Sequence, residues 1–249
     1  MKNGNRTRSL WNILSRWYFI IRHCTHWKKW NGQNLTDIAW SRKPFGLATN
    51  FFEQNDECSS NDRDAVACIS RNRTVKYLKR NQIPKNVINA TLAVEDSTFY
   101  THYGIRPDRI LKAFQKTLFE GEKQGASTIT QQLVKNVLLT PERTFSRKIK
   151  EVVLTFFVEK KYSKDQILEL YLNNISYGGV AWGIQSASQK YFNKNVWELD
   201  LAEASMLAGL PSSPSTFSPL VDLTLAKQRQ LHVLNRMYDL GYITKTELL

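Results

Sequence analysis

Apolar residues recur at helical spacing through most of the chain from about residue 83 onward. Pro84 is expected to open the first helix, and Ser127 is the expected N-cap of another. In that second helix Ile129, Leu133 and Val137 form a stripe at intervals of four residues, which is typical of one buried helix face. The same pattern predicts helices over residues 145–160, 183–193, 198–209 and 222–240.

A capping box precedes one further helix. Ser163 and Gln166 have the spacing in which each side chain bonds the backbone of the other, so a helix is predicted over residues 164–173. Gly178 and Gly179 then interrupt the pattern. Strict alternation of apolar and polar residues is nearly absent, and no internal repeat is visible. The fold class is therefore predicted to be mostly α.

The first 72 residues do not follow this pattern. Residues 1–43 hold nine Lys and Arg against one acid, five of the seven Trp lie within the first 40 residues, and residues 44–72 are polar without a clear period. No run of about 20 apolar residues occurs there, so no transmembrane helix is expected. Two interpretations stay open: a basic amphipathic helix on an anionic membrane, or a basic tail without stable order. A shifted reading frame or a misassigned start is a third explanation.

Composition limits the classes of protein to which the chain can belong. With 42% hydrophobic residues, the chain of 249 residues has enough material for a packed core. Three Cys, none in a CxxC pair, exclude a disulfide scaffold, and four His leave little for a multi-His metal site. The net charge of +13 implies an acidic partner: nucleic acid, anionic lipid or a phosphorylated substrate.

Two carboxylates stand together where the first predicted helix ends. Glu95 and Asp96 follow an apolar helix and begin the segment EDSTFYTHYG. Like charge and the negative end of the helix dipole both disfavour ionisation there. A raised pKa would suit a general base. The alternative is an ordinary solvated pair of acids.

Two further segments carry polar groups that a helical core does not need. Gly125 to Asn136 reads GASTITQQLVKN, where small residues precede a helix N-terminus and Lys135 follows two turns on; this suits an anionic or sugar ligand. Arg143, Arg147, Lys148 and Lys150 then gather near Glu151. Arg147 and Glu151 have the spacing of a surface ion pair, but four cations exceed what one glutamate needs. They could instead bind a diphosphate.

Taken together and in order, these segments resemble the peptidoglycan glycosyltransferases, glycosyltransferase family 51. Residues 95–104 are similar to that family's EDxxFxxHxG motif, residues 125–136 to GxSTITQQxxKN, residues 147–151 to RKxxE, and residues 164–173 to KxxILxxYLN. Residues 226–234 match a fifth, Arg-rich motif more loosely. The resemblance extends from about residue 73 to residue 249, which separates residues 1–72 from a predicted glycosyltransferase domain at 73–249.

The resemblance implies a lysozyme-like, mostly α fold with a head lobe and a smaller jaw lobe that enters the membrane. It implies polymerisation of lipid II into glycan strands, with inversion and release of undecaprenyl diphosphate. Glu95 would be the general base, and Glu151 a second catalytic glutamate that positions a cation or a donor group. The residues expected to bind substrate or to shape its site are Asp96, Ser127, Thr128, Gln131, Gln132, Lys135, Arg143, Arg147 and Lys148.

The resemblance also carries expectations about cofactors, partners and location. Members often use a divalent cation such as Mg²⁺ or Mn²⁺, for which Glu151 is the candidate ligand, although the sequence has no metal motif of its own. The expected partners are lipid II, the growing strand, the membrane surface and other cell-wall synthesis proteins, but no nucleic acid. The expected location is the extracytoplasmic face of the cytoplasmic membrane.

Two functions of other classes compete with this interpretation. Two glutamates in a helical domain also suit a lysozyme-like hydrolase, although the cations for a diphosphate argue against it. The basic, Trp-rich start alone would suit a nucleic-acid or membrane-binding module. Bifunctional members of the family continue into a serine transpeptidase domain. Because no SxxK pattern occurs here, that activity is not expected from these residues.

Overall fold

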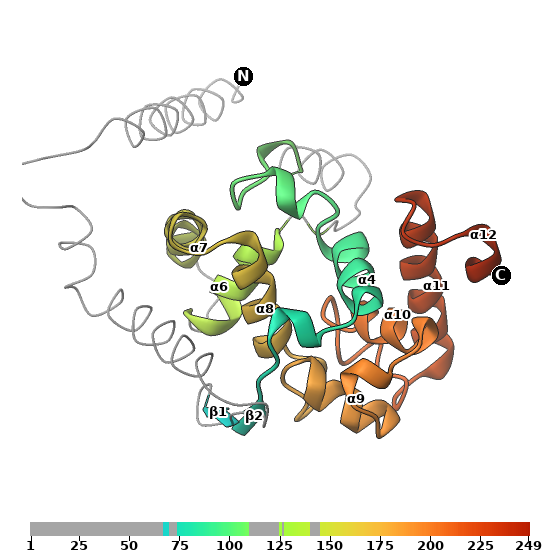
Figure 1. Cartoon of the computed structure of the whole chain (residues 1–249). Coiled ribbons are helices and arrows are strands. Elements are labelled where there is room, and N and C mark those ends of the chain that lie inside the picture. The colour runs from blue at the N-terminus through green and yellow to red at the C-terminus, as the bar shows by residue number, and fades with distance from the viewer. Residues whose placement is uncertain (1–66, 70–73, 110–124, 126, 140–144) are drawn as a thin grey trace, which may run out of the picture. The chain divides into compact units, whose positions relative to one another are not determined.

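A computed structural model describes residues 67–69, 74–109, 125, 127–139 and 145–249 (Figure 1). The chain divides into two units, Met1–Phe52 and Glu53–Leu249, and all described residues belong to the second. Residues 1–66, which include the basic, Trp-rich start with its two open interpretations, lie outside the described residues, as does Arg143.

The described part of the chain is mostly helical, as the periodicity predicted. Two short strands, β1 and β2, pair antiparallel with Ala67 opposite Lys76, and this hairpin crosses the predicted boundary at residues 72–73. Strands of three residues are too short for alternation to reveal them. In chain order the elements are β1 (Ala67–Ile69), β2 (Thr74–Lys76), η1 (Arg80–Gln82), α4 (Lys85–Glu95), η2 (Phe99–Thr101), α6 (Ile129–Val137), α7 (Phe145–Lys161), α8 (Lys164–Asn174), α9 (Ile184–Phe192), η3 (Val196–Glu198), α10 (Leu201–Gly209), α11 (Leu223–Asp239) and α12 (Lys245–Leu248).

The helix caps are partly those expected. Ser163 and Gln166 form the predicted capping box of α8, and Pro84 is the N-cap of α4. The prediction that Ser127 caps α6 is wrong, because Thr128 takes that place. The Thr128 hydroxyl accepts from the Gln131 amide at 3.2 Å, and Gln131 Oε1 accepts from the Thr128 amide at 3.1 Å. This reciprocal pair satisfies two donors that a helix start leaves open.

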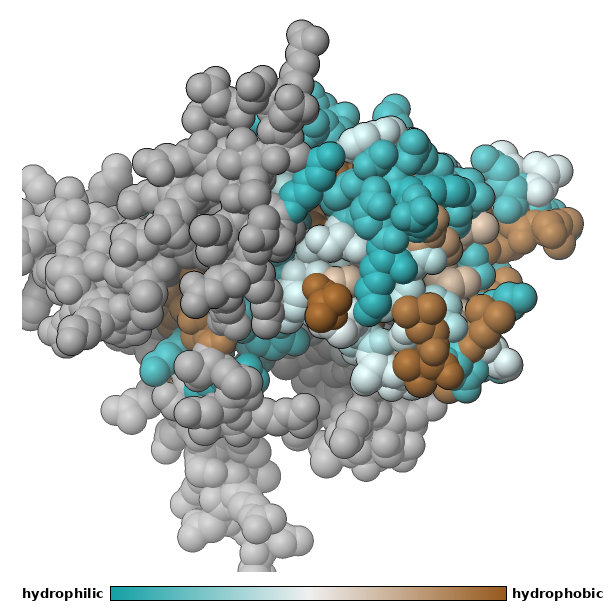
Figure 2. Space-filling model, turned by 90° about the horizontal axis from the view of Figure 1, so that it is seen from below, coloured by the Kyte–Doolittle hydropathy of each residue, from teal (hydrophilic) through white to brown (hydrophobic). Residues whose placement is uncertain are grey.

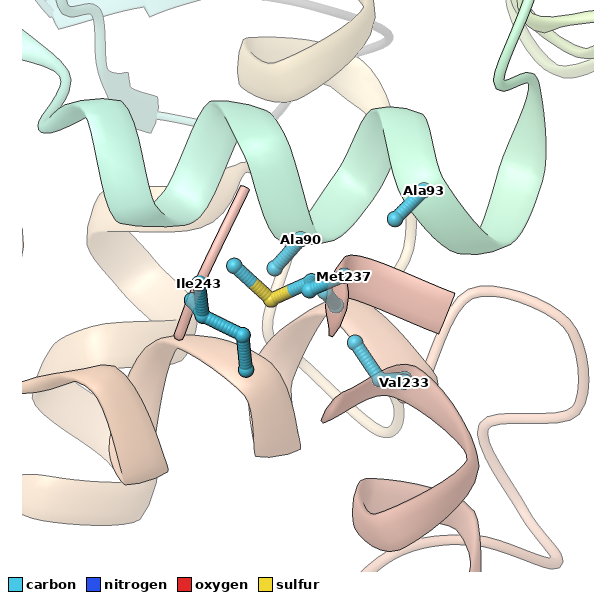
Figure 3. Close-up of a cluster of buried hydrophobic side chains, with 6 residues drawn as sticks. Ala90, Ala93, Val233, Met237 and Ile243 are labelled. Carbon is cyan, nitrogen blue, oxygen red and sulfur yellow. The ribbon is translucent and has the colours of Figure 1, made fainter. Parts of the chain in front are cut away.

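Helices α4, α10 and α11 pack against one another and form what we call the apolar helix group. Their contact is lined by apolar side chains, among them Ala90 and Ala93 of α4, whose small size lets the helix backbones approach closely (Figure 3). Met237 of α11 is fully buried and fills the space between these helices. Non-directional packing therefore fixes α4, at whose end Glu95 stands.

Helices α6, α7 and α8 form a second set, the polar helix group, in which α6 packs against both α7 and α8 (Figure 1). Buried polar side chains connect its members: Thr130 of α6 donates to Glu159 of α7, and Lys164 of α8 pairs with Glu159 at 2.7 Å. Gly104 lies against α7 with a φ of +81°, where a Cβ atom would meet Glu159 Cγ at 2.6 Å. Only glycine fits this close approach.

Among the described residues, no helix is both long and apolar enough to cross a membrane. On the face seen in Figure 2, hydrophobic residues form separate spots on the described surface, with hydrophilic residues between them.

Candidate active site

Glu95 ends α4 and faces the polar helix group. Its Oε2 atom accepts a hydrogen bond of 2.7 Å from the side-chain amide of Gln132 on α6. Its Oε1 atom is buried, and the described part of the chain offers it no hydrogen-bond partner. Burial raises the pKa of Glu95 above its ordinary 4.5, while the Gln132 hydrogen bond and the charges of Arg229 and Lys135 oppose that rise. The result is a carboxylate with one oxygen held by Gln132 and the other buried without a hydrogen-bond partner in the described structure.

Asp96 is fully buried and is held by the protein itself. Its Oδ2 atom accepts from His102 Nε2 at 2.8 Å and from the Ile129 amide, the first of α6, at 3.2 Å. Because His102 Nδ1 accepts from the Gly104 amide, Nε2 must carry the proton that Asp96 accepts. Arg109 Nη1 lies 3.9 Å from Asp96 Oδ1. These contacts make Asp96 a residue that anchors the start of α6 beside Glu95.

The residues predicted from the second motif divide into two kinds. Thr128 and Gln131 are buried in the cap of α6, and Thr128 also donates to the carbonyl oxygen of Gly104 at 2.6 Å. Ser127 precedes the cap and is half-buried. Gln132 and Lys135, also half-buried, are the two that interact with Glu95. The cap thus sets where α6 begins, and Gln132 and Lys135 form the polar side of the site.

Lys135 belongs to a cluster of charges that joins α6 to the start of α7. Partial burial lowers the pKa of Lys135, as do the charges of Lys148 and Arg147, while Glu151 and Glu95 raise it. The cluster thus joins three cations to two carboxylates, and its excess of positive charge favours an anionic ligand.

Glu151 is buried and pairs with Lys148 three residues earlier. The interpretation of Arg147 and Glu151 as a surface ion pair is therefore wrong, because Glu151 is not at the surface. The Glu151 backbone carbonyl also accepts from the Thr155 hydroxyl at 2.7 Å. Glu151 is thus placed to orient Lys148, whose side chain is about half exposed.

Two residues of the site were not among those predicted. Tyr171 of α8 is buried and donates through its hydroxyl to Gln132 Oε1 at 3.2 Å. Arg229 of α11 contributes a charge that lowers the pKa of Glu95, and its Nε donates to the Gly209 carbonyl at 3.3 Å. Tyr171 lies in the segment that matches the fourth motif, and Arg229 in the segment that matches the fifth. These matches were the only indication in the sequence that the two residues belong to the site. The sequence alone does not show that Tyr171 and Arg229 lie near Glu95.

Two other residues of the fourth motif, Glu169 and Asn173, stabilise the fold. Asn173 of α8 accepts from the Leu78 amide and donates to the Leu78 carbonyl, both at 2.8 Å. Glu169 accepts from the Arg80 amide at 2.6 Å and from the Tyr77 hydroxyl at 2.9 Å. These bonds tie the segment before α4 to α8.

Comparisons with known proteins show which family this chain is similar to. A family model described as transglycosylase matches residues 62–238. Penicillin-binding protein 1A of Escherichia coli is 47% identical over 189 residues, or 76% of this chain and 22% of that protein. Penicillin-binding protein 1F of Bacillus subtilis is 46% identical over 168 residues, or 67% and 24%. A crystal structure of penicillin-binding protein 1A from Haemophilus influenzae is 27% identical, with 71% of this chain and 17% of that chain covered, at a TM-score of 0.43.

The chain belongs to the transglycosylase family, which confirms the resemblance that the ordered motifs predicted. It spans less than a quarter of the length of these relatives.

Proposed function

We propose that this chain is a peptidoglycan glycosyltransferase that polymerises lipid II into glycan strands by inverting transfer. The observation that carries the proposal is Glu95: a carboxylate with a raised pKa, one oxygen held by Gln132 and the other without a partner in the described structure. A half-buried carboxylate of this kind suits a general base whose pKa lies nearer to the working pH.

In the proposed reaction, the 4-hydroxyl of the acceptor's GlcNAc attacks C1 of the donor's MurNAc. The bond between C1 and the acceptor oxygen forms as the bond between C1 and the diphosphate oxygen breaks. The hydroxyl proton passes to Glu95, and undecaprenyl diphosphate leaves. Attack from the side opposite the leaving group inverts the configuration from α to β.

Charge grows on the diphosphate as it leaves, so fixed cations near it lower the barrier. Lys135, Arg147 and Lys148 are the proposed cations, supported by their shared electrostatic cluster around Glu151. A role for Arg143 stays a prediction. Ser127 and Gln132 are proposed to contact the sugars, because neither is fully buried. Thr128 and Gln131 would act indirectly, through the cap of α6.

A divalent cation stays a prediction from the resemblance. In the part of the chain that the structure describes, no three His, Cys, Asp or Glu side chains group in a way that could hold a metal ion. Lys148 already pairs with Glu151, and Lys135 lies in the same cluster. Because cations surround the only proposed ligand, these residues do not fit a resident Mg²⁺ or Mn²⁺. We therefore derive no step through a metal.

The division into head and jaw lobes and a place at the extracytoplasmic face of the cytoplasmic membrane are also proposals. One feature of α7 supports membrane contact: Ile149, Val153 and Phe156 recur along the helix and are exposed, with Lys148 and Lys150 beside them. Exposed apolar groups flanked by lysines favour an anionic lipid surface. Flotation of the protein with vesicles that contain anionic lipid tests this proposal.

The proposed function is tested by incubating the purified protein with lipid II and separating the products by length. The wild type should form glycan strands, and Glu95→Gln should lose this activity by roughly a hundredfold to ten-thousandfold. Strands formed equally well by Glu95→Gln would remove Glu95 as the base. Release of reducing ends from mature peptidoglycan, without polymerisation of lipid II, would instead favour the hydrolase.

A further inference from the structure

Two hydrogen bonds in series connect a buried tyrosine of α8 to the proposed base. The Tyr171 hydroxyl donates to Gln132 Oε1 at 3.2 Å, and Gln132 Nε2 donates to Glu95 Oε2 at 2.7 Å. The three residues come from α8, α6 and α4, so the series crosses from the polar helix group to the apolar helix group. Both hydrogen bonds of this series join residues on different helices. Their alignment therefore depends on how the helices pack.

The polarity of the series follows from the chemistry of its members. An amide side chain has a donating end and an accepting end, and an ionised carboxylate only accepts. The donating end of Gln132 must therefore face Glu95. Its accepting end then faces Tyr171, which must donate. Burial raises the pKa of Tyr171 well above its ordinary value, so the hydroxyl keeps its proton and remains a donor.

We propose that Tyr171 is a positioning residue for the glycosyl transfer: its hydroxyl fixes the Gln132 amide, which holds Glu95 by Oε2 and leaves Oε1 directed at the acceptor hydroxyl. This inference rests on the proposed function. Without the tyrosine hydroxyl, the Gln132 amide is free to turn. Its oxygen would then repel the carboxylate, and Glu95 would lose the hydrogen bond from Gln132 that stabilises its charge.

Tyr177 provides a matched control. It is also fully buried, and Glu95 contributes to raising its pKa, as it does for Tyr171. Its hydroxyl, however, has no hydrogen-bond partner in the described structure. Both tyrosines thus lie within the electrostatic reach of Glu95, and they differ in the hydrogen bond to Gln132. Removing a buried hydroxyl that has no partner leaves no other group unsatisfied.

The experiment compares Tyr171→Phe with Tyr177→Phe in the lipid II assay across a range of pH, with melting temperatures measured in parallel. Tyr171→Phe should lower turnover near neutral pH roughly threefold to tenfold, the loss expected for one hydrogen bond. Its acid limb should move to higher pH by about half to one unit, because Glu95 loses a bond that favours its charged form. Tyr177→Phe should leave both turnover and the acid limb unchanged. Equal behaviour of the two variants would overturn the proposal.

A double-mutant cycle separates positioning from packing. Gln132→Met keeps the length of the side chain and removes both hydrogen bonds, so by itself it should reproduce the shift of the acid limb. In that background Tyr171→Phe should have no further effect. A further loss of the same size as in the wild type would mean that Tyr171 acts by another route. If Tyr171→Phe does not fold, an unshifted acid limb in Gln132→Met would overturn the proposal.

Failure of the proposed function would be distinguished from failure of this inference. If the wild type does not polymerise lipid II, the proposed function fails. The titration of Glu95 can still be followed by ¹³C NMR of the labelled carboxyl group. An upward shift of that titration in Tyr171→Phe, but not in Tyr177→Phe, would support the positioning contact, and equal titration in both would overturn it.

Discussion

The two helix groups that meet at Glu95 are held together by different forces. In the apolar helix group, Ala90, Ala93, Val233 and Met237 pack with no polar partner to satisfy. In the polar helix group, buried hydroxyls, carboxylates and amides bond across from one helix to the next, as between Thr130 and Glu159. Apolar packing fixes the distance between helices but tolerates small rotations, whereas hydrogen bonds also fix direction.

This difference matches what each group contributes to the site. The apolar group supplies α4 and thus the position of Glu95. The polar group supplies the partners that must point at it, Gln132 and Lys135. Asp96 connects the two, because it follows α4 and accepts from the first amide of α6. The comparison therefore predicts that substitutions in the two groups have separable consequences.

The largest loss of stability is expected from Asp96→Ala. This change removes the acceptor of both the His102 proton and the first amide of α6, and leaves Arg109 beside an empty site. Breaking a buried ionic network by removing one partner costs about 3–5 kcal/mol. Urea denaturation should report that loss. Asp165→Ala, at an exposed aspartate, is the control and should change stability by less than about 1 kcal/mol. Equal effects would show that Asp96 is not an anchor.

A somewhat smaller loss is expected from Met237→Ala in the apolar helix group. Met237 is fully buried between α4 and α10, and truncating such a side chain costs about 2–5 kcal/mol. Turnover per folded molecule should stay near that of the wild type at a temperature where both are folded. A fall in turnover without a fall in melting temperature would contradict the proposal that the apolar group affects stability and the polar group affects turnover.

The smallest change in stability, with a clear loss of function, is expected from Lys135→Ala. Partial burial already disfavours the charge of Lys135, so its removal should hardly change the melting temperature. Loss of one cation beside the leaving diphosphate should lower turnover roughly tenfold or more. Lys160→Ala, at an exposed lysine of α7, is the control. Equal turnover in the two variants would contradict a role of Lys135 at the diphosphate.

Local features of the fold could be predicted from the sequence because their causes are local. The capping box of Ser163 and Gln166 needs only a spacing of three residues, and the stripe of α6 needs only a period. The prediction for Ser127 failed because either Ser127 or Thr128 could cap α6. The choice fell to Thr128, whose hydroxyl also reaches the distant carbonyl of Gly104.

The same reasoning explains what could be predicted of the site. The position of Glu95 after an apolar helix made it a candidate base, with a solvated acid pair as the alternative, and the family resemblance favoured the base. Tyr171 and Arg229 were not identified, since their connection to Glu95 depends on α6, α8 and α11 packing against or near α4. The burial of Glu151 is likewise a tertiary property, because its spacing from Arg147 also fits a surface pair.

Glu95 also links activity to stability. Its pKa is raised in the folded protein, so the folded state binds the proton more tightly than the unfolded chain does. Stability is therefore lost as the pH rises through that raised pKa, and the loss remains at higher pH. Glu95→Gln should keep the hydrogen bond from Gln132 and remove the buried charge. Near neutral pH its melting temperature should be equal to or above that of the wild type while its turnover is lost.

The central claim is that burial between the two helix groups prepares Glu95 as the base, and the pH dependence of wild-type kcat/KM for lipid II tests it most directly. The base must be ionised to accept a proton, so turnover should fall as the pH is lowered through the raised pKa of Glu95. We predict an acid limb with an apparent pKa above 4.5, the ordinary value for Glu95. Turnover that stays constant down to pH 4.5 would contradict the account.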